Sequence, residues 1–181
     1  MALQKKAELM DETAVLRTMR RMTHEIIERN RVLENVVLVG IKRRGVPLAE
    51  MLARNILEFE GVRVPVGYID ITLYRDDLTC TADAPVTGES CMNADITGKT
   101  VIITDDVIYT GRTVRAAIEA VFSFGRPASV QLAELIDRGH RELPFRPDFV
   151  GKNVPTSHDE AIRVLVPEFD GALRAELYSI T

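Results

Sequence analysis

Two adjacent carboxylates, Asp105 and Asp106, stand where an apolar run meets a short glycine-containing loop. The segment reads V-I-I-T-D-D-V-I-Y-T-G-R-T over residues 101–113, and a helix is predicted to begin near Thr113. The start of a helix binds anions because its N–H groups are unpaired and its dipole is positive there. Carboxylates beside a phosphate would repel it, so the acidic pair needs another partner, and a ribose diol offers two donors. We therefore predict a site for a ribose 5-phosphate group.

The loop has the residue types that a phosphate site requires. Gly111 lets the backbone approach an anion closely, and the hydroxyl groups of Thr110 and Thr113 add donors. Neither G-x-G-x-x-G nor G-x-x-x-x-G-K-[ST] occurs in the sequence, so the common dinucleotide and P-loop motifs are absent. The alternative is an acidic pair that only caps the following turn.

The apolar pattern around this loop alternates between strands and helices. Continuous apolar runs predict buried strands, and apolar residues at helical spacing predict amphipathic helices. Asp11 is a plausible cap for the first helix, because it precedes Glu12 and the apolar periodicity. Helices are predicted at 11–29, 45–59 and 110–124, and strands or extended segments at 35–41, 64–74, 100–105, 129–136, 148–150, 161–166 and 172–179. This alternation predicts an α/β fold with a mostly parallel central sheet flanked by helices.

Residues 75–99 show no clear periodicity and are rich in Thr, Asp, Ala and Gly. A stretch of that length inside a compact domain is usually an active-site lid or a disordered segment. Strong strands flank it on both sides, which favours a lid.

The composition indicates a single globular domain, since the 181 residues are 46% apolar and 28% charged. No apolar run approaches the roughly 20 residues that span a membrane, and no signal peptide is evident, so we expect a cytoplasmic protein. The net charge of −4 argues against a generally basic nucleic-acid binder, although a local basic patch stays compatible with it. Cys80 and Cys91 have no histidines nearby, which favours surface thiols over a disulfide or a metal site.

Several segments together resemble one known family. The 101–113 segment is similar to the 5-phosphoribosyl-1-pyrophosphate (PRPP) motif of type I phosphoribosyltransferases. The chain most resembles the bifunctional pyrimidine operon attenuation regulators and uracil phosphoribosyltransferases. The matching segments are H-E-I-I-E-R-N (24–30), D-I-T-L-Y-R-D-D-L (70–78), D-R-G-H-R-E-L-P (137–144) and D-F-V-G-K-N-V-P-T-S (148–157).

This resemblance extends over nearly the whole chain and implies the type I phosphoribosyltransferase fold. The fold would form one domain over 1–181, with a flexible lid at about 75–99 and a small C-terminal hood at about 138–181. The implied reaction converts uracil and PRPP to UMP and pyrophosphate, with Mg²⁺ carried on PRPP. The family resemblance also implies UMP-dependent binding to pyr leader mRNA, which attenuates transcription, and a homo-oligomer.

Two alternatives stay open. One is an RNA-binding regulator whose catalysis is vestigial, and the other is a purine-salvage phosphoribosyltransferase without RNA binding. Purine-salvage relatives usually carry an aspartate where this chain has Tyr109, which favours a pyrimidine base.

The resemblance assigns roles to the loops that would hold PRPP. Asp105 and Asp106 would bind the ribose hydroxyls, and residues 109–113 would enclose the 5-phosphate. The implied PRPP-binding segment is Asp105, Asp106, Val107, Ile108, Tyr109, Thr110, Gly111, Arg112 and Thr113. Together with Arg75, a lid residue that would meet pyrophosphate, the acidic pair forms the implied catalytic set.

A second loop, V-G-I-K-R-R-G over residues 39–45, resembles the family's pyrophosphate loop. Lys42, Arg43 and Arg44 would supply the charge and the donors that a pyrophosphate requires. The family more often has Thr where Arg43 stands, so this loop carries one more positive charge than is usual in the family. A solvated basic turn is the alternative.

The segment D-F-V-G-K-N-V over residues 148–154 resembles the part of the hood that binds the base. The implied base-binding residues are Arg138, Phe149, Val150, Lys152 and Ile162. For Phe149 and Val150 the alternative is core packing, and for Arg138 it is a structural ion pair.

The first predicted helix has an apolar face and a basic face. At about 100° per residue, Val15, Met19, Met22 and Ile26 share one face, and the basic residues lie opposite. The family's RNA surface includes this helix and a later segment of the chain. The implied RNA-binding residues are Arg17, Arg20, Arg21, His24, His140, Arg141, Arg146 and Lys152. A merely solvated face is the alternative.

Overall fold

The computed structural model describes residues 3–72 and 90–180. In chain order its elements are β1 (Leu3–Met10), α1 (Glu12–Arg29), a 3-10 turn (Leu33–Asn35), β2 (Val36–Ile41), α2 (Gly45–Glu60), β3 (Val66–Ile69), β4 (Thr100–Ile108), α3 (Arg112–Phe122), β5 (Ser129–Asp137), β6 (Phe149–Asn153), β7 (Glu160–Leu165), α4 (Pro167–Asp170) and β8 (Arg174–Ile180). Each predicted helix and strand has a counterpart here. β1 and the short α4 have none among the predicted elements, and β4 is longer than predicted.

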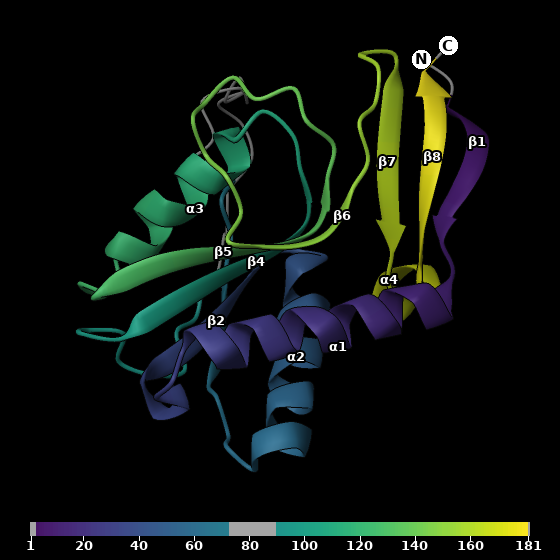
Figure 1. The fold of residues 1–181 in the computed structure, drawn as a ribbon. Helices are drawn as coiled ribbons and strands as arrows, with labels where there is room; N and C mark the ends of the chain where they lie inside the picture. Colours follow the sequence, from purple (N-terminus) through teal and green to yellow (C-terminus); the bar gives the residue numbers. More distant parts are fainter. Residues whose placement is uncertain (1–2, 73–89, 181) are drawn as a thin grey trace.

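The central sheet has five described strands in the order β3-β2-β4-β5-β6 (Figure 1). All four strand pairings are parallel, which confirms the predicted α/β fold. β2 is buried along its whole length, as expected of a strand that helices cover on both faces. The carboxyl ends of the strands therefore meet at one edge, where ligands bind in such sheets.

Helices α1 and α2 cover one face of the sheet and α3 covers the other (Figure 1). Val15, Met19, Met22 and Ile26 are at most 1% exposed, which confirms the predicted inward face of α1. The Asp11 carboxylate accepts a hydrogen bond from the Ala14 N–H at 2.7 Å, so Asp11 is the N-cap as predicted.

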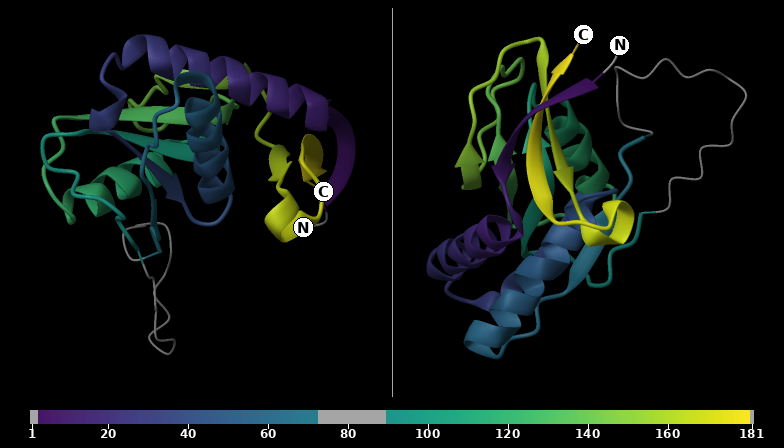
Figure 2. Two further views of the ribbon diagram at one scale, coloured as in Figure 1. Left: turned by 90° about the horizontal axis from the view of Figure 1, so that it is seen from below. Right: turned by 90° about the vertical axis from the view of Figure 1, so that its right-hand side faces the viewer.

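The C-terminal part of the predicted hood pairs with β1 in a separate antiparallel sheet, in the order β1-β8-β7. Leu3 pairs with Ile180, so the two ends of the chain lie side by side (Figure 2). Buried carboxylates hold this sheet together, because Glu160 binds Lys6 and Glu176 binds Lys5. The hydrogen bond from Lys6 lowers the pKa of Glu160 to about 2.

The predicted lid lies mainly outside the described residues, and so do Arg75 and Cys80. Its last part, residues 90–99, is described and is anchored to the body of the domain. The backbone groups of Cys91 and Tyr68 form two hydrogen bonds of 2.9 Å, and Ile96 is 1% exposed. A lid therefore stays a prediction only for the residues before Ser90.

Candidate active site

The acidic pair lies where β4 has already separated from one of its neighbours. β4 pairs with β2 only as far as Thr104, but it pairs with β5 as far as Ile108. Asp105 and Asp106 thus lie within β4 rather than at its end, which corrects the predicted strand boundary. Beyond Thr104 the edge that faces β2 is open to the loop that follows β2. This opening is what lets carboxylates of a central strand face a ligand.

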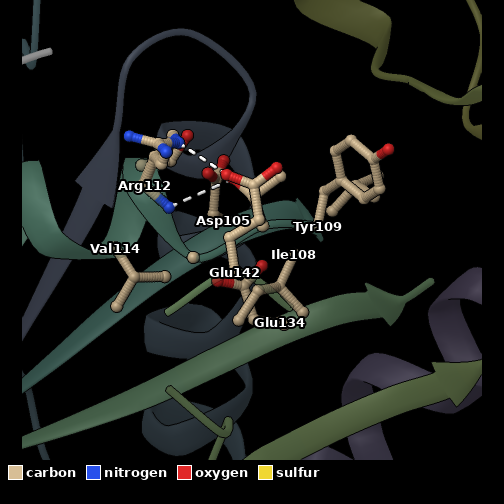
Figure 3. A pocket seen from close by; sticks show the side chains of 11 residues that line it. Asp105, Ile108, Tyr109, Arg112, Val114, Glu134 and Glu142 are labelled. Carbon is tan, nitrogen blue, oxygen red and sulfur yellow. Dashed lines mark hydrogen bonds and ion pairs between the residues drawn. The ribbon is translucent and has the colours of Figure 1, made fainter. Parts of the chain in front are cut away.

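The loop after β4 encloses a cavity of about 300 Å³ (Figure 3). Gly111 is the N-cap of α3 and has a φ of 92°, a conformation that favours glycine. A Cβ on Gly111 would also lie only 3.3 Å from the Cβ of Leu143. Glycine is therefore favoured both by the turn and by the close approach of the 143 segment. The cavity is lined by Asp105, residues 107–114, Glu134 and Glu142.

The basic loop after β2 faces the same acidic pair. A second cavity, of about 340 Å³, is lined by Ile41, Lys42, Arg43, Arg44, Asp70, Ile71, Thr72, Asp105, Asp106, Val107 and Thr113. Gly45 allows this approach, because a Cβ there would lie 2.3 Å from the carbonyl oxygen of Thr104. The peptide between Lys42 and Arg43 is cis. Two loops about 60 residues apart in the sequence thus form one site.

Charges in this second cavity oppose one another. Burial raises the pKa of Asp106, while a hydrogen bond with the Asp105 side chain and then the charge of Arg44 act to lower it. Arg44 is itself held by the hood, since its guanidinium donates to Asp170 Oδ1 at 3.0 Å. The hydroxyl of Thr72 donates to Asp70 at 2.6 Å and lowers the pKa of that carboxyl. Acceptors for hydroxyl groups and donors for phosphate oxygens therefore stand side by side.

A cluster of aromatic and cationic side chains adjoins the phosphate loop. The Arg138 guanidinium lies 4.0 Å from the centre of the Tyr109 ring and donates to Thr156 Oγ1 at 3.0 Å and to the carbonyl of Glu160 at 2.7 Å. His140 contacts the Tyr109 ring edge-on at 5.8 Å and the His158 ring at 4.2 Å between ring centres. Arg138 makes these contacts in place of the structural ion pair considered above.

His158 was not among the predicted site residues, although it directly follows the 148–157 motif. The turn before β7 brings the His158 ring to this cluster, against His140. A histidine in an irregular polar loop carries no periodicity that would point to a site.

The remaining predicted base contacts have other neighbours. Phe149 is 2% exposed and packs in the core beside Ala133. This is the core-packing alternative given above, so we do not propose that Phe149 contacts the base. Ile162 is half-buried against the same core. The carbonyl of Val150 accepts from Arg21 at 3.0 Å, and the Lys152 ammonium donates to the carbonyl of Leu9 at 2.9 Å.

The basic residues of α1 are exposed, and we call Arg17, Arg20, Arg21 and His24 the α1 basic face. His24 stacks on Phe59 with 4.4 Å between ring centres, and Arg20 lies over the same ring at 4.5 Å. Arg20 also makes a bidentate ion pair with Glu58, in which each guanidinium nitrogen lies 3.1 Å from a carboxylate oxygen. Arg21 joins this face to β6 through the carbonyls of Val150 and Gly151.

The later basic segment divides between two regions. Arg146 and Lys152 are exposed, whereas His140 belongs to the cluster around Tyr109. Arg141 holds loops together: its guanidinium donates to the carbonyls of Phe145, Tyr109 and Gly139 and binds Asp137. Sequence alone does not separate these two kinds of cation.

Among residues 3–72 and 90–180, no group of three or more His, Cys, Asp or Glu side chains is placed to hold a metal ion. In the same part of the chain, no helix is long and apolar enough to cross a membrane.

Comparison with known proteins agrees with this geometry. Residues 6–165 match the family model described as the phosphoribosyl transferase domain. A Bifunctional protein PyrR from Clostridium perfringens is 57% identical over 173 residues, which cover 96% of this chain and 97% of the relative. Another, from Thermoanaerobacter pseudethanolicus, is 58% identical over 165 residues, which cover 91% of this chain and 93% of that relative.

Solved structures share the fold at lower identity. A hypoxanthine phosphoribosyl transferase from Trypanosoma cruzi has a TM-score of 0.73 at 21% identity, covering 98% of this chain and 92% of that one. A hypoxanthine-guanine phosphoribosyltransferase from Bacillus anthracis has a TM-score of 0.72 at 20% identity, covering 98% and 99%. The match over most of the sequence decides the family: this chain belongs to the phosphoribosyl transferase family and, within it, to the PyrR proteins.

Proposed function

We propose that this chain converts uracil and PRPP to UMP and pyrophosphate, and that it regulates pyrimidine synthesis by binding pyr leader mRNA when UMP is bound. Membership in the PyrR proteins supports both activities. One observation carries the enzymatic part. The cavity of the phosphate loop at Gly111 and the cavity of the basic loop at Lys42 share Asp105, and the second is also lined by Asp106, at the carboxyl edge of the sheet.

The two cavities divide PRPP between them. The N–H groups at the start of α3 would bind the 5-phosphate, and Asp105 and Asp106 would accept from the ribose hydroxyls. Lys42, Arg43 and Arg44 would bind the pyrophosphate. Mg²⁺ would enter as part of the PRPP substrate.

The chemistry then requires orientation and charge stabilisation. N1 of uracil loses its proton and forms the new bond to C1 of the ribose, while the bond from C1 to the pyrophosphate oxygen breaks; the proton passes to solvent or to the departing pyrophosphate. The pyrophosphate leaves with its negative charge next to the basic loop, and the carboxylates of β4 lie near the positive charge that develops on the ribose. Arg75 and a lid formed by residues before Ser90 would exclude water from the ribose while it carries positive charge. Both assignments stay predictions.

The cluster of Tyr109, Arg138 and His140 favours a small planar base. It lies directly beside the phosphate loop, where the base of a bound nucleotide would be expected. Hypoxanthine phosphoribosyltransferases share the fold, so purine salvage is the second candidate, but at 20–21% identity that likeness concerns the fold alone.

A substrate panel tests the choice of base. With PRPP and Mg²⁺, uracil should be converted far faster than hypoxanthine, guanine, adenine or orotate. Release of pyrophosphate under identical conditions is the measurement. Comparable turnover of any purine would favour the salvage enzyme instead.

The regulatory part rests on the α1 basic face and on Arg146 and Lys152, whose side chains are exposed to solvent. Isothermal titration of one preparation with UMP and with a pyr leader RNA tests it. RNA should bind more tightly when UMP is present, and equal RNA affinity with and without UMP would contradict the regulatory role. A cytoplasmic location and a homo-oligomer complete the proposal.

A further inference from the structure

Glu134 is a buried carboxyl that none of the roles above uses. Its exposed fraction is 0%, and it stands on β5 among the side chains that line the phosphate-loop cavity (Figure 3). Within the described part of the chain, neither of its carboxyl oxygens has a hydrogen-bond partner. A buried polar group without a partner is costly, so its retention beside a ligand cavity indicates a task there.

The strand register places Glu134 opposite Asp105. The two residues are partners in the parallel pairing of β4 with β5, so their side chains lie on the same face of the sheet, beneath the start of α3. Adjacent strands are about 4.8 Å apart, so the two carboxyl groups are near enough to interact through their charges, although they form no hydrogen bond with each other in this structure. Glu134 therefore lies directly behind one of the proposed ribose acceptors.

The groups that face Glu134 are mostly negative. Asp105 and Asp106 approach from β4, Asp137 lies on its own strand, and Arg141 approaches from the loop after β5. Burial first, and then Asp105 and Asp106, raise the pKa of Glu134 well above its ordinary value, and Arg141 opposes them. Arg112 and Glu142 line the same cavity and form an ion pair with each other at 2.9 Å. A neutral carboxylic acid is the form that suits these surroundings.

We propose that Glu134 is a positioning residue: it stands in the cavity as a neutral acid and, when a ligand fills the cavity, turns to donate a hydrogen bond to the Asp105 carboxylate, holding it toward the ribose hydroxyls. A neutral carboxylic acid has one O–H donor, and a carboxylate has about four lone-pair sites, so this bond is compatible with other contacts of Asp105. An ionised Glu134 would instead repel both Asp105 and a bound phosphate. The proposal rests on the proposed function only for the identity of the ligand.

In this arrangement, ligand binding is coupled to protonation of the Glu134 carboxyl group. A bound nucleotide phosphate adds negative charge near Glu134, so the complex holds the proton more tightly than the free protein does. Affinity should therefore fall as the pH rises through the pKa of Glu134 in the free protein, by up to about tenfold per pH unit. The phosphate of UMP itself titrates near pH 6, but it does so with every variant, so differences between variants isolate Glu134.

Titration calorimetry with UMP between pH 6 and pH 9 tests the proposal. Glu134→Gln keeps a neutral donor, so it should bind within about twofold of the wild type at low pH and lose less affinity as the pH rises. Glu134→Leu removes the donor and should bind about fivefold more weakly at low pH, the worth of one hydrogen bond. Glu119 is an exposed carboxylate on α3, so Glu119→Gln is the control for the loss of one negative charge. The affinity of this control for UMP should change with pH as that of the wild type does.

Protein stability provides a second readout, because the folded state should hold a proton on Glu134 that the unfolded state has lost. Wild-type stability relative to Glu134→Gln should decline as the pH rises from the ordinary glutamate pKa to the raised one, and then level off. Identical pH profiles of UMP binding for wild type, Glu134→Gln and Glu134→Leu would overturn the positioning role. A wild type that binds PRPP but not UMP would contradict the proposed base alone, and the same comparison of variants would then be made with PRPP.

Discussion

Arg138 and Arg141, near the substrate loops, differ from Arg17 and Arg20 of α1 in the surroundings of their guanidinium groups. Arg138 is 8% exposed and Arg141 is half-buried, and both donate to backbone carbonyls of neighbouring loops. Arg17 and Arg20 lie on the surface, and the partner of Arg20 is the exposed side chain of Glu58. Cations of the first kind hold the site in shape, whereas cations of the second kind are available to a polyanion.

The largest effect should follow removal of a loop-holding cation. Arg141→Met leaves three carbonyls and the Asp137 carboxylate without their donor, so the free energy of unfolding should fall by about 2–4 kcal/mol. UMP affinity should fall as well, because Tyr109 lies in the phosphate loop. Urea unfolding and UMP titration are the measurements. Arg17→Met is the matched control and should change stability by less than about 0.5 kcal/mol; equal effects of the two variants would remove the distinction.

A smaller effect is expected within the site itself. Asp106→Asn replaces a charged acceptor of the ribose diol by a neutral amide, so turnover and PRPP affinity should fall about tenfold or more. The amide oxygen can still accept from the N–H of Val107, which should preserve the fold. Initial rates across a range of PRPP concentrations check this expectation. Wild-type kinetics in this variant would show that the carboxylate has another role, and Glu119→Gln serves as the charge control.

The α1 basic face should show the reverse pattern, with RNA binding affected and catalysis unchanged. Arg17→Glu should weaken binding of pyr leader RNA severalfold and reduce the slope of log K against log salt by about 0.7 for each RNA phosphate that the variant no longer neutralises. Adding Arg21→Glu should weaken binding further, although Arg21 also donates to β6 carbonyls, so the single variant is the cleaner test. Uracil conversion by Arg17→Glu should equal that of the wild type. Unchanged RNA affinity would leave this face merely solvated.

Sequence patterns predicted the parts of the molecule whose structure depends on local burial. The β2 run and the inward face of α1 are apolar at the spacing their elements need, and both are buried as predicted. β1 escaped prediction because it is largely exposed and charged, and backbone pairing with β8 at the other end of the chain stabilises it. Glu134 escaped for a related reason, since a single acid in a strand pattern is normally read as solvent-facing. The site residues whose roles depend on distant partners were therefore the ones that local pattern could not identify.

The smallest effect should come from the acidic partner of the exposed arginines. The Arg20 and Glu58 side chains are 49% and 58% exposed, so their ion pair should contribute less than about 1 kcal/mol to stability. Glu58→Gln removes a negative charge beside the predicted RNA surface and frees Arg20 from a competing anion. RNA affinity should therefore rise, by about threefold at most, while the free energy of unfolding hardly changes. Filter binding at two salt concentrations would measure it, with Glu119→Gln as a remote control. Weaker RNA binding in Glu58→Gln would mean that Glu58 positions Arg20 over Phe59 for its ligand, and Arg20 would then resemble the cations of the substrate loops.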